Sequence, residues 1–382
     1  MELSTDRILT THVGSLPRPP QMLEVLVASG SFEQSKASAN PDYERRTREA
    51  VAQVVREQVQ AGTDVVSDGE MGRVVFSIYA TERLTGFDGE PRTWDGLIEF
   101  SMFPELFEPM LVASPVLPVC GGEVTWRGRE HIQADIERFN GALQGVNPRE
   151  AFMTAVSPGQ IYFNSSNDFY PDEEAFVMAC AEAMGNEYRA IVDAGFLLQI
   201  DAPDLAFGWG LVPFADKSLD DYRKNVEMHV EAINVALQGI PAGRVRLHVC
   251  WGNGPWPHVR DVPLAEIIDI IYRVNAQGLS VEGANGRHGH EWSVFRDHPL
   301  PDDKVLLPGV IDTVTNVVEH PDLVAERIER YAGVVGKERV IASTDCGFSS
   351  AAAAPNVHPS IVQPKLQALI EGSRRASERL WP

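Results

Sequence analysis

A histidine and a cysteine lie two residues apart in the stretch VRLHVCW, residues 245–251. If this stretch is a β-strand, His248 and Cys250 point to the same face, with their β-carbons roughly 7 Å apart. Both side chains can then reach one zinc ion, which binds imidazole nitrogen and thiolate sulfur at about 2.0 to 2.3 Å. Cys346 and Glu282 each lie near the end of another apolar run. The pattern predicts a zinc site formed by His248, Cys250, Glu282 and Cys346.

The alternative interpretation of the histidine and cysteine pair is a buried histidine beside an unreactive cysteine. A second cysteine at another strand end favours the metal site. The position assigned to Glu282 is open to other ligands, because the nearby segment GRHGHEW contains further imidazole and carboxylate groups, namely His288, His290 and Glu291. Beyond the zinc site, the sequence identifies no catalytic residue.

Polar residues also follow other apolar runs. They are His12, Ser15, Asp68, Glu70, Asp201 and Asp204. Carboxylates at strand ends can bind the ammonium group of a small substrate, although each one is equally suited to cap the helix that follows. Arg18 and Arg73 either bind an anionic group or pair with carboxylates, and Trp209, Trp251 and Trp256 either line a pocket or pack in the core.

The elements that must position these residues are short apolar runs ending in small or polar residues. Eight occur, at 8–15, 64–70, 152–158, 197–203, 245–251, 279–285, 305–312 and 340–347. Helical patterns lie between most of them, at 43–62, 171–195, 219–239, 264–278 and 323–336. Alternating strands and helices predict a parallel sheet. Eight repeats predict an α/β fold, a (β/α)8 TIM barrel, whose chemistry lies at the C-terminal ends of the strands.

The segment between the second and third runs is too long for a single crossover. Within it, LPVCGGEVTWRG at 117–128 has a Gly-Gly turn between apolar runs, which predicts a β-hairpin. We therefore expect one barrel domain over 1–382 with an insertion subdomain at 75–150, rather than two separate domains. The alanine run 351–354 is expected to be a loop over the site.

The composition excludes several classes of protein. A chain of 382 residues can bury a large core, and its net charge of −21 argues against binding to nucleic acid or an anionic membrane. Four cysteines without CxxC spacing do not resemble a disulfide framework. The sequence shows neither a signal pattern nor an apolar run of the roughly 18 residues needed to cross a bilayer. These features predict a cytoplasmic protein.

Six segments together resemble the catalytic domain of the cobalamin-independent methionine synthase family. They are TTHVGSLPRP (10–19), VVSDGE (65–70), QIDAPDL (199–205), HVC (248–250), GVIDTVTNVVEHP (309–321) and STDCG (343–347). The similarity spans roughly residues 8–375, and the ordered set is far more specific than any one piece. It implies a barrel of the kind shared with uroporphyrinogen decarboxylase, without the family's separate N-terminal barrel.

The resemblance also implies roles for individual residues. The family's zinc ligands fall on His248, Cys250, Glu282 and Cys346, and its homocysteine contacts on Ser15, Glu70 and Asp201. The implied reaction is zinc-dependent methyl or alkyl transfer to a thiol, with homocysteine giving methionine. In this family zinc activates the thiol as a thiolate, which attacks a carbon of the alkyl donor.

The sequence departs from the family pattern at two places, and the second departure concerns the alkyl donor. Ala202 replaces a glutamate, and the run 312–315 replaces the segment with the histidine that protonates methylfolate. One alternative is therefore epoxide opening, as in the related epoxyalkane:coenzyme M transferases. Further alternatives are a metal-free decarboxylase of the uroporphyrinogen type and a non-catalytic thiol-binding barrel. The sequence leaves open the donor, homo-oligomer formation and a partner protein that delivers the methyl group.

Overall fold

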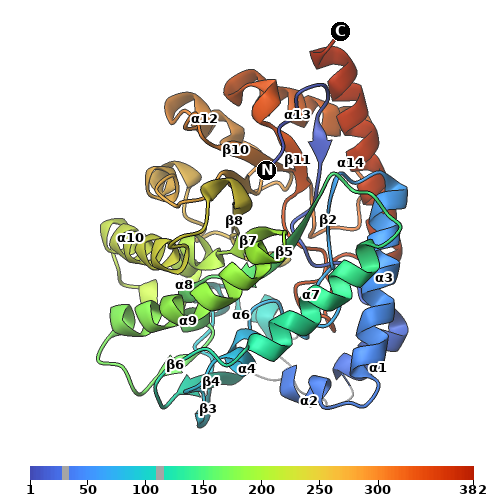
Figure 1. Ribbon diagram of the computed structural model, residues 1–382. Coiled ribbons are helices and arrows are strands. Elements are labelled where there is room, and N and C mark those ends of the chain that lie inside the picture. The colour runs from blue at the N-terminus through green and yellow to red at the C-terminus, as the bar shows by residue number, and fades with distance from the viewer. Residues whose placement is uncertain (28–33, 109–115) are drawn as a thin grey trace.

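Eight parallel strands form a nearly closed barrel in the computed structural model, which describes residues 1–27, 34–108 and 116–382 (Figure 1). The strands are β1 (Leu9–Thr10), β2 (Val65–Ser67), β5 (Glu150–Val156), β7 (Leu197–Asp201), β8 (Val245–Val249), β9 (Gly278–Val281), β10 (Val305–Ile311) and β11 (Ile341–Thr344). Each lies within or overlaps one of the eight predicted runs. Their order is β1-β11-β10-β9-β8-β7-β5-β2. The predicted (β/α)8 barrel is confirmed.

Hydrogen bonds also join β1 and β2, the first and last strands in this order. Asp64 donates its backbone N–H to the carbonyl of Thr10 at 3.1 Å, and the Thr11 hydroxyl donates to the carbonyl of Val65 at 3.0 Å. Strands β7, β8 and β10 are buried along their whole length, as expected where both faces of a parallel sheet are covered. They therefore provide a rigid frame for residues at their ends.

Helices surround the barrel and connect its strands (Figure 1). The main ones are α3 (Tyr43–Ala61), α7 (Arg129–Leu143), α9 (Glu173–Asp193), α10 (Leu219–Ala236), α13 (Pro321–Val335) and α14 (Pro359–Leu380), and the shorter ones are α1 (Pro20–Val27), α2 (Gln34–Ser38), α8 (Pro158–Phe163), α11 (Ile268–Ile271) and α12 (Val294–Asp297). Four predicted helices, at 43–62, 171–195, 219–239 and 323–336, are confirmed. Local capping explains where two of these helices begin, since Asp172 caps α9 and Ser218 forms a capping box at the start of α10. No helix within the described ranges combines the length and apolar character needed to cross a membrane.

The helix predicted over 264–278 is wrong, because only a 3-10 turn and the short helix α11 form there. Ile267, at φ −128°, leaves the helical region between the two pieces. Near the end of the predicted helix, the Lys304 ammonium donates hydrogen bonds to the backbone carbonyls of Val274 and Ala276. Contacts distant in sequence thus outweigh the helical spacing of the isoleucines. The helix propensity of isoleucine is also lower than that of alanine or leucine, because its side chain is β-branched.

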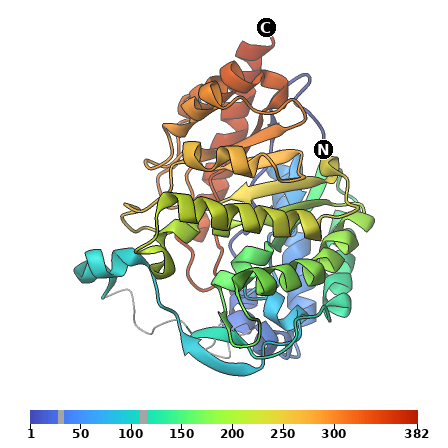
Figure 2. The same ribbon diagram turned by 90° about the vertical axis from the view of Figure 1, so that its left-hand side faces the viewer.

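A second, three-stranded sheet lies in the segment between β2 and β5 and just beyond it. Its strands are β3 (Gly89–Thr93), β4 (Val116–Cys120) and β6 (Ser166–Asn167), in the order β3-β4-β6. Three short helices accompany it, α4 (Ala80–Arg83), α5 (Ile98–Met102) and α6 (Pro104–Phe107). In Figure 2 the cyan helices α5 and α6 extend away from the barrel.

The hairpin predicted at 117–128 is wrong. β4 pairs with β3 and β6, and the chain beyond the Gly-Gly turn pairs instead with the segment before β3, through a bridge between Leu84 and Trp126. Gly121 and Gly122 both donate to the carbonyl of Gly86, which brings these segments together. That residues 75–150 form an insertion subdomain of a single domain stays a prediction; α7, inside this range, packs on α3 and α9 of the barrel.

Candidate metal centre

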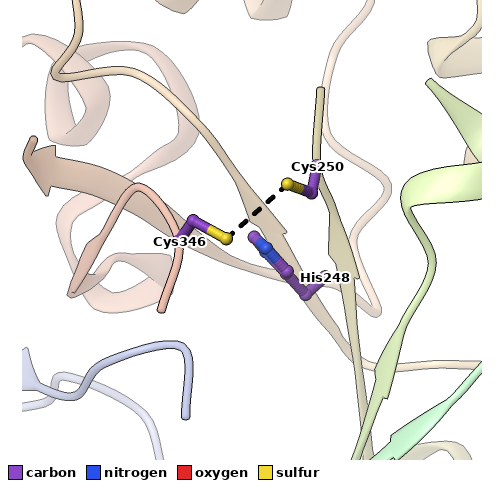
Figure 3. Close-up of side chains that lie close together, drawn as sticks. All are labelled: His248, Cys250 and Cys346. Atoms are coloured by element: carbon purple, nitrogen blue, oxygen red, sulfur yellow. Dashed lines mark hydrogen bonds between the residues drawn. The ribbon is translucent and has the colours of Figure 1, made fainter. Parts of the chain in front are cut away.

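Three side chains converge at the C-terminal mouth of the barrel (Figure 3). His248 lies on β8 and Cys250 directly follows that strand, whereas Cys346 follows β11. One potential ligand atom from each residue lies within 4.8 Å of the other two, and the two sulfur atoms are 3.6 Å apart. The alternation of β8 therefore aims His248 and Cys250 the same way, as the sequence indicated.

The chemistry of these three side chains fits a zinc ion. The Nε2 atom of His248 is buried without a hydrogen-bond partner, while Nδ1 lies 3.3 Å from the Ser280 hydroxyl. Burial lowers the pKa of His248 to about 4, so its imidazole is neutral and has a lone pair to donate. A hydrogen bond with Cys250 and burial raise the pKa of Cys346. Buried imidazole nitrogen and two cysteine sulfurs are a donor set typical of zinc.

Glu282 does not belong to this converging group. It is buried, and its Oε1 atom accepts the backbone N–H of Trp251 at 2.9 Å. Its Oε2 atom accepts from Asn285 at 2.7 Å and from Arg287 at 2.8 Å. Burial opposes ionisation of Glu282, but Arg287 and His288 hold its pKa below the usual range. The role of Glu282 as a ligand therefore stays a prediction that requires its carboxylate to leave these partners.

The other ligands considered near Glu282 are also outside the converging group. His288 lies 2.9 Å from the Glu291 carboxylate and 3.0 Å from that of Asp261, so both ring nitrogens are engaged. His290 is exposed to solvent. Glu291 also accepts the backbone N–H of Leu264, which fixes it to the neighbouring loop.

A cavity of about 310 Å³ opens beside the three converging side chains. Its walls include His248, Cys250 and Cys346, and also the three residues expected to bind substrate, Ser15, Glu70 and Asp201. The barrel thus brings together residues from the ends of five strands or the loops after them. Their role in substrate binding stays a prediction, whereas their common location is an observation.

Glu70 and Asp201 form an acidic pair in the cavity wall. Glu70 adopts a left-handed backbone conformation, at φ 56°, and accepts a hydrogen bond from the Thr154 hydroxyl at 2.8 Å. Its Oε2 atom is buried without a hydrogen-bond partner. Burial and the neighbouring Glu70 raise the pKa of Asp201 well above its usual range. Two close buried carboxylates stabilise a bound cation such as an ammonium group.

Ser15 reaches the cavity because Gly347 makes room for it. A β-carbon at Gly347 would collide with the Ser15 hydroxyl. That hydroxyl accepts the backbone N–H of Ser349 at 3.4 Å, and the Ser15 carbonyl accepts that of Phe348 at 2.9 Å. The loop that carries Cys346 is therefore joined directly to the loop after β1.

The two arginines considered as anion binders are occupied inside the protein. Arg18 donates to the carbonyls of Leu16 and Ser349 at 3.0 and 2.6 Å. Arg73 donates to the hydroxyl and carbonyl of Thr154 at 2.9 and 2.7 Å. They lie 3.9 and 3.8 Å from the Glu70 carboxylate, and neither lines the cavity. The sequence alone could not decide whether Arg18 and Arg73 bind an anionic group or pair with carboxylates, because their partners are known only in the folded chain.

The remaining candidates also have structural partners. His12 pairs with Gln58 at 2.7 Å, Asp68 accepts the backbone N–H of Glu70, and Asp204 pairs with His229. Among the tryptophans, Trp251 is buried against His288, and Trp209 packs on Tyr222. Only Trp256 of the three lines the cavity.

Several wall residues were not found by sequence reasoning. They are Phe76, Ile78, Trp94, Leu117, Asn164, Phe207 and Asn253. Trp94 and Leu117 come from the small sheet region, whose position over the barrel mouth no local pattern indicates. Asp345 was also missed, although the STDCG segment contained it; its carboxylate accepts the backbone N–H groups of Gly283, Ala284 and Asn285, each at 2.8 Å. Asp345 thus ties the turn after β9 to Cys346.

The segment after β10 lies close to the cavity without supplying a proton donor. The Asp312 carboxylate accepts the backbone N–H groups of Val314 and Thr315, which closes a turn. Thr313 donates its hydroxyl to the side chain of Asn253 at 2.8 Å. None of residues 312–315 lines the cavity.

Residues 8–360 match the family of the cobalamin-independent synthase catalytic domain. A 2-hydroxypropyl-CoM lyase from Xanthobacter autotrophicus is 26% identical over 399 residues, covering 96% of this chain and 94% of that protein. A methionine synthase from Saccharolobus solfataricus is 24% identical over 376 residues, covering 97% and 95%. A solved B12-independent methionine synthase from a Shewanella species, in complex with selenomethionine, shares the fold, with a TM-score of 0.70, 17% identity and coverage of 98% and 99%. This chain therefore belongs to the cobalamin-independent synthase catalytic-domain family.

Proposed function

We propose that this protein is a zinc-dependent enzyme that transfers an alkyl group to a thiol, with homocysteine as the acceptor. One observation carries the proposal: the nitrogen and sulfur atoms of His248, Cys250 and Cys346 converge in the wall of a cavity that also contains Glu70 and Asp201. Two relatives support alkyl transfer to a thiol, one named a methionine synthase and the other a 2-hydroxypropyl-CoM lyase, and the first of them supports homocysteine as the acceptor.

His248, Cys250 and Cys346 would hold the metal, with Glu282 as a further ligand once it leaves Arg287. Zinc, when bound, lowers the pKa of a thiol that binds it, so that the thiol is a nucleophile near neutral pH. The chain's own residues position the acceptor: Glu70 and Asp201 bind its ammonium group, and Ser15 contacts it beside Cys346. Glu70 and Asp201 are themselves buried, which strengthens these electrostatic contacts.

The walls favour an amino thiol over a sulfonate-bearing thiol. Among the described residues that line the cavity there is no lysine or arginine, whereas two carboxylates are present. Coenzyme M would place its sulfonate near these carboxylates without a cation to pair with it. Epoxide opening with coenzyme M is kept as the second candidate, because the relative named 2-hydroxypropyl-CoM lyase is as similar to this chain as the methionine synthases are.

The proposal is tested by zinc content and by X-ray absorption at the zinc edge, without thiol, with homocysteine and with coenzyme M. We expect one zinc per chain and one new sulfur neighbour with homocysteine. A new sulfur neighbour with coenzyme M alone would favour the second candidate. A fully folded protein that binds no zinc would contradict both, and would leave the metal-free decarboxylase as the interpretation.

A matched pair of cysteine variants tests the assignment of the ligands. Cys346→Ala is expected to lose zinc and alkyl transfer while keeping its secondary structure, because the other metal-binding atoms cannot hold the ion alone. Cys180→Ala is the control, since Cys180 is also buried but lies in α9. Full zinc occupancy and unchanged activity in Cys346→Ala would rule out this metal centre.

A further inference from the structure

Aromatic rings form part of the cavity wall outside the strands of the barrel. They belong to Phe76, Trp94, Phe207 and Trp256. All four are half-buried, so part of each ring surface remains accessible. Phe207 packs close to Gly252, two residues after Cys250, where a β-carbon would meet its ring at 2.5 Å. The aromatic wall therefore begins next to the three converging side chains.

No arginine or lysine of the described residues lies over these four rings, although Trp256 stacks on the imidazole of His258. The cation–π pairs found in the described chain place arginine or lysine over Tyr79, Phe152, Trp209, Trp292 and Trp381. None of those five rings lines the cavity. An aromatic wall with two carboxylates nearby, and with no lysine or arginine among the described lining residues, attracts an organic cation.

Among the described residues that line the cavity, there is also no further acidic group. Its titratable lining residues are His248, Cys250 and Cys346, which face the metal position, and Glu70 and Asp201, which we assign to the acceptor's ammonium group. A leaving group that departs as an anion, such as an alkoxide or an amide, needs a proton donor. A leaving group that departs as a neutral molecule needs none.

From these observations we propose that the alkyl donor is an onium compound, a sulfonium or quaternary ammonium ion held against Trp256, Phe207, Trp94 and Phe76. This inference rests on the proposed function and specifies the donor class of the same site. The thiolate sulfur of the acceptor forms a bond to the donor's methyl carbon with its lone pair. The bond from that carbon to the positively charged sulfur or nitrogen breaks, and its electron pair leaves with a neutral thioether or amine. Charge and atoms balance without a proton.

Binding of an unreactive cation tests this proposal separately from catalysis. Choline is titrated into the protein, zinc-free and zinc-loaded, by calorimetry, and compared with its uncharged isostere, in which carbon replaces the quaternary nitrogen. The two probes have nearly the same shape, so the difference reports the charge. We expect choline to bind about tenfold more tightly than the isostere. Equal or tighter binding of the isostere would overturn the proposal, because the wall would then recognise only apolar shape.

Variants identify the part of the wall that recognises the cation. Trp256→Leu and, independently, Trp94→Leu are expected to reduce the preference for choline at least threefold while the isostere still binds. Trp292→Leu is the matched control, because Trp292 lies under Arg296 away from the cavity. An unchanged preference in both wall variants would contradict the assignment, and two different wall residues guard against one variant failing to fold.

Turnover completes the test and separates its two possible failures. Zinc-loaded protein with homocysteine is offered S-methylmethionine, a sulfonium ion, or methyltetrahydrofolate, whose leaving group needs a proton. We expect methionine from the sulfonium at a rate at least tenfold above that from the folate. If homocysteine adds sulfur to the zinc but the folate is the better donor, the donor inference fails and the proposed function stands. If homocysteine does not reach the zinc, the proposed function itself fails.

Discussion

A buried histidine between two carboxylates predicts how the stability of the protein changes with pH. The Nδ1 atom of His229 lies 2.9 Å from Asp204, and Nε2 lies 3.1 Å from Glu173. Asp204 also accepts a hydrogen bond from the Ser157 hydroxyl, and a β-carbon at Gly159 would collide with both His229 and Asp204. Burial alone would lower the pKa of His229, but the hydrogen bonds to Asp204 and Glu173 outweigh it and raise the pKa to about 9.

The sign and size of the effect follow from the two pKa values. The unfolded chain has the ordinary histidine pKa of 6.5, and the folded chain a pKa of about 9. The folded state therefore binds the proton more tightly. Its extra stability is fully present below pH 6.5 and is lost as the pH rises through about 9. At 1.36 kcal/mol per pKa unit, the protonated histidine contributes about 3 kcal/mol to the free energy of unfolding.

Urea denaturation of the wild type and of His229→Gln, across neutral to alkaline pH, measures this contribution. Glutamine is uncharged, so we expect the variant to be less stable by about 3 kcal/mol near pH 6 and the difference to shrink to under about 1 kcal/mol above pH 9.5. His320→Gln is the control, because the His320 side chain is 72% exposed. A difference between wild type and His229→Gln that stays constant with pH would refute a protonated His229.

Three further substitutions test contacts around the site and in the barrel. Gly347→Ala places a methyl group against the Ser15 hydroxyl, and we expect kcat/KM for homocysteine to fall about 10- to 100-fold in steady-state assays with little loss of stability. Lys365→Met removes the cation 3.1 Å from Glu319; because both groups are buried, the free energy of unfolding should fall by about 3 to 5 kcal/mol in urea titrations. Asp345→Ala removes the acceptor of three backbone N–H groups, so we expect the free energy of unfolding to fall by about 3 kcal/mol or more. We also expect weaker zinc binding in chelator competition. A zinc affinity equal to that of the wild type would contradict the role of Asp345 in holding the turn.

The barrel and the convergence of His248, Cys250 and Cys346 could be predicted because they depend on local patterns. A strand buried on both faces needs a short apolar run, and every run found in the sequence contains or overlaps one strand of the barrel. In β8, residue alternation alone determines that His248 and Cys250 share a face. The meeting of Cys250 with Cys346, which are 96 positions apart, follows from the closure of the barrel.

The incorrect predictions involve contacts that no local pattern contains. The chain only bends at Gly122, and β4 pairs with the earlier strand β3 and not with the residues that follow Gly122. In the segment predicted as a helix at 264–278, two backbone carbonyls accept hydrogen bonds from Lys304, which is distant in sequence. Arg18 resembled an anion-binding residue, and only the folded chain shows its guanidinium bound to backbone carbonyls. In each case the competing partner is remote, so propensity and periodicity could not reveal it.

The two parts of the cavity wall have different structural origins, and this difference matters for function. The three converging side chains belong to β8 (His248) and to the residues just after β8 (Cys250) and β11 (Cys346), where the hydrogen-bonded barrel fixes the backbone. The aromatic residues, in contrast, come from loops after β2 and β7, from the small sheet region and from the loop after Cys250. Loops tolerate substitution more readily than barrel strands do. Changes in the aromatic wall can therefore alter which molecule fits the cavity while the nitrogen and sulfur atoms proposed to hold the metal stay in place.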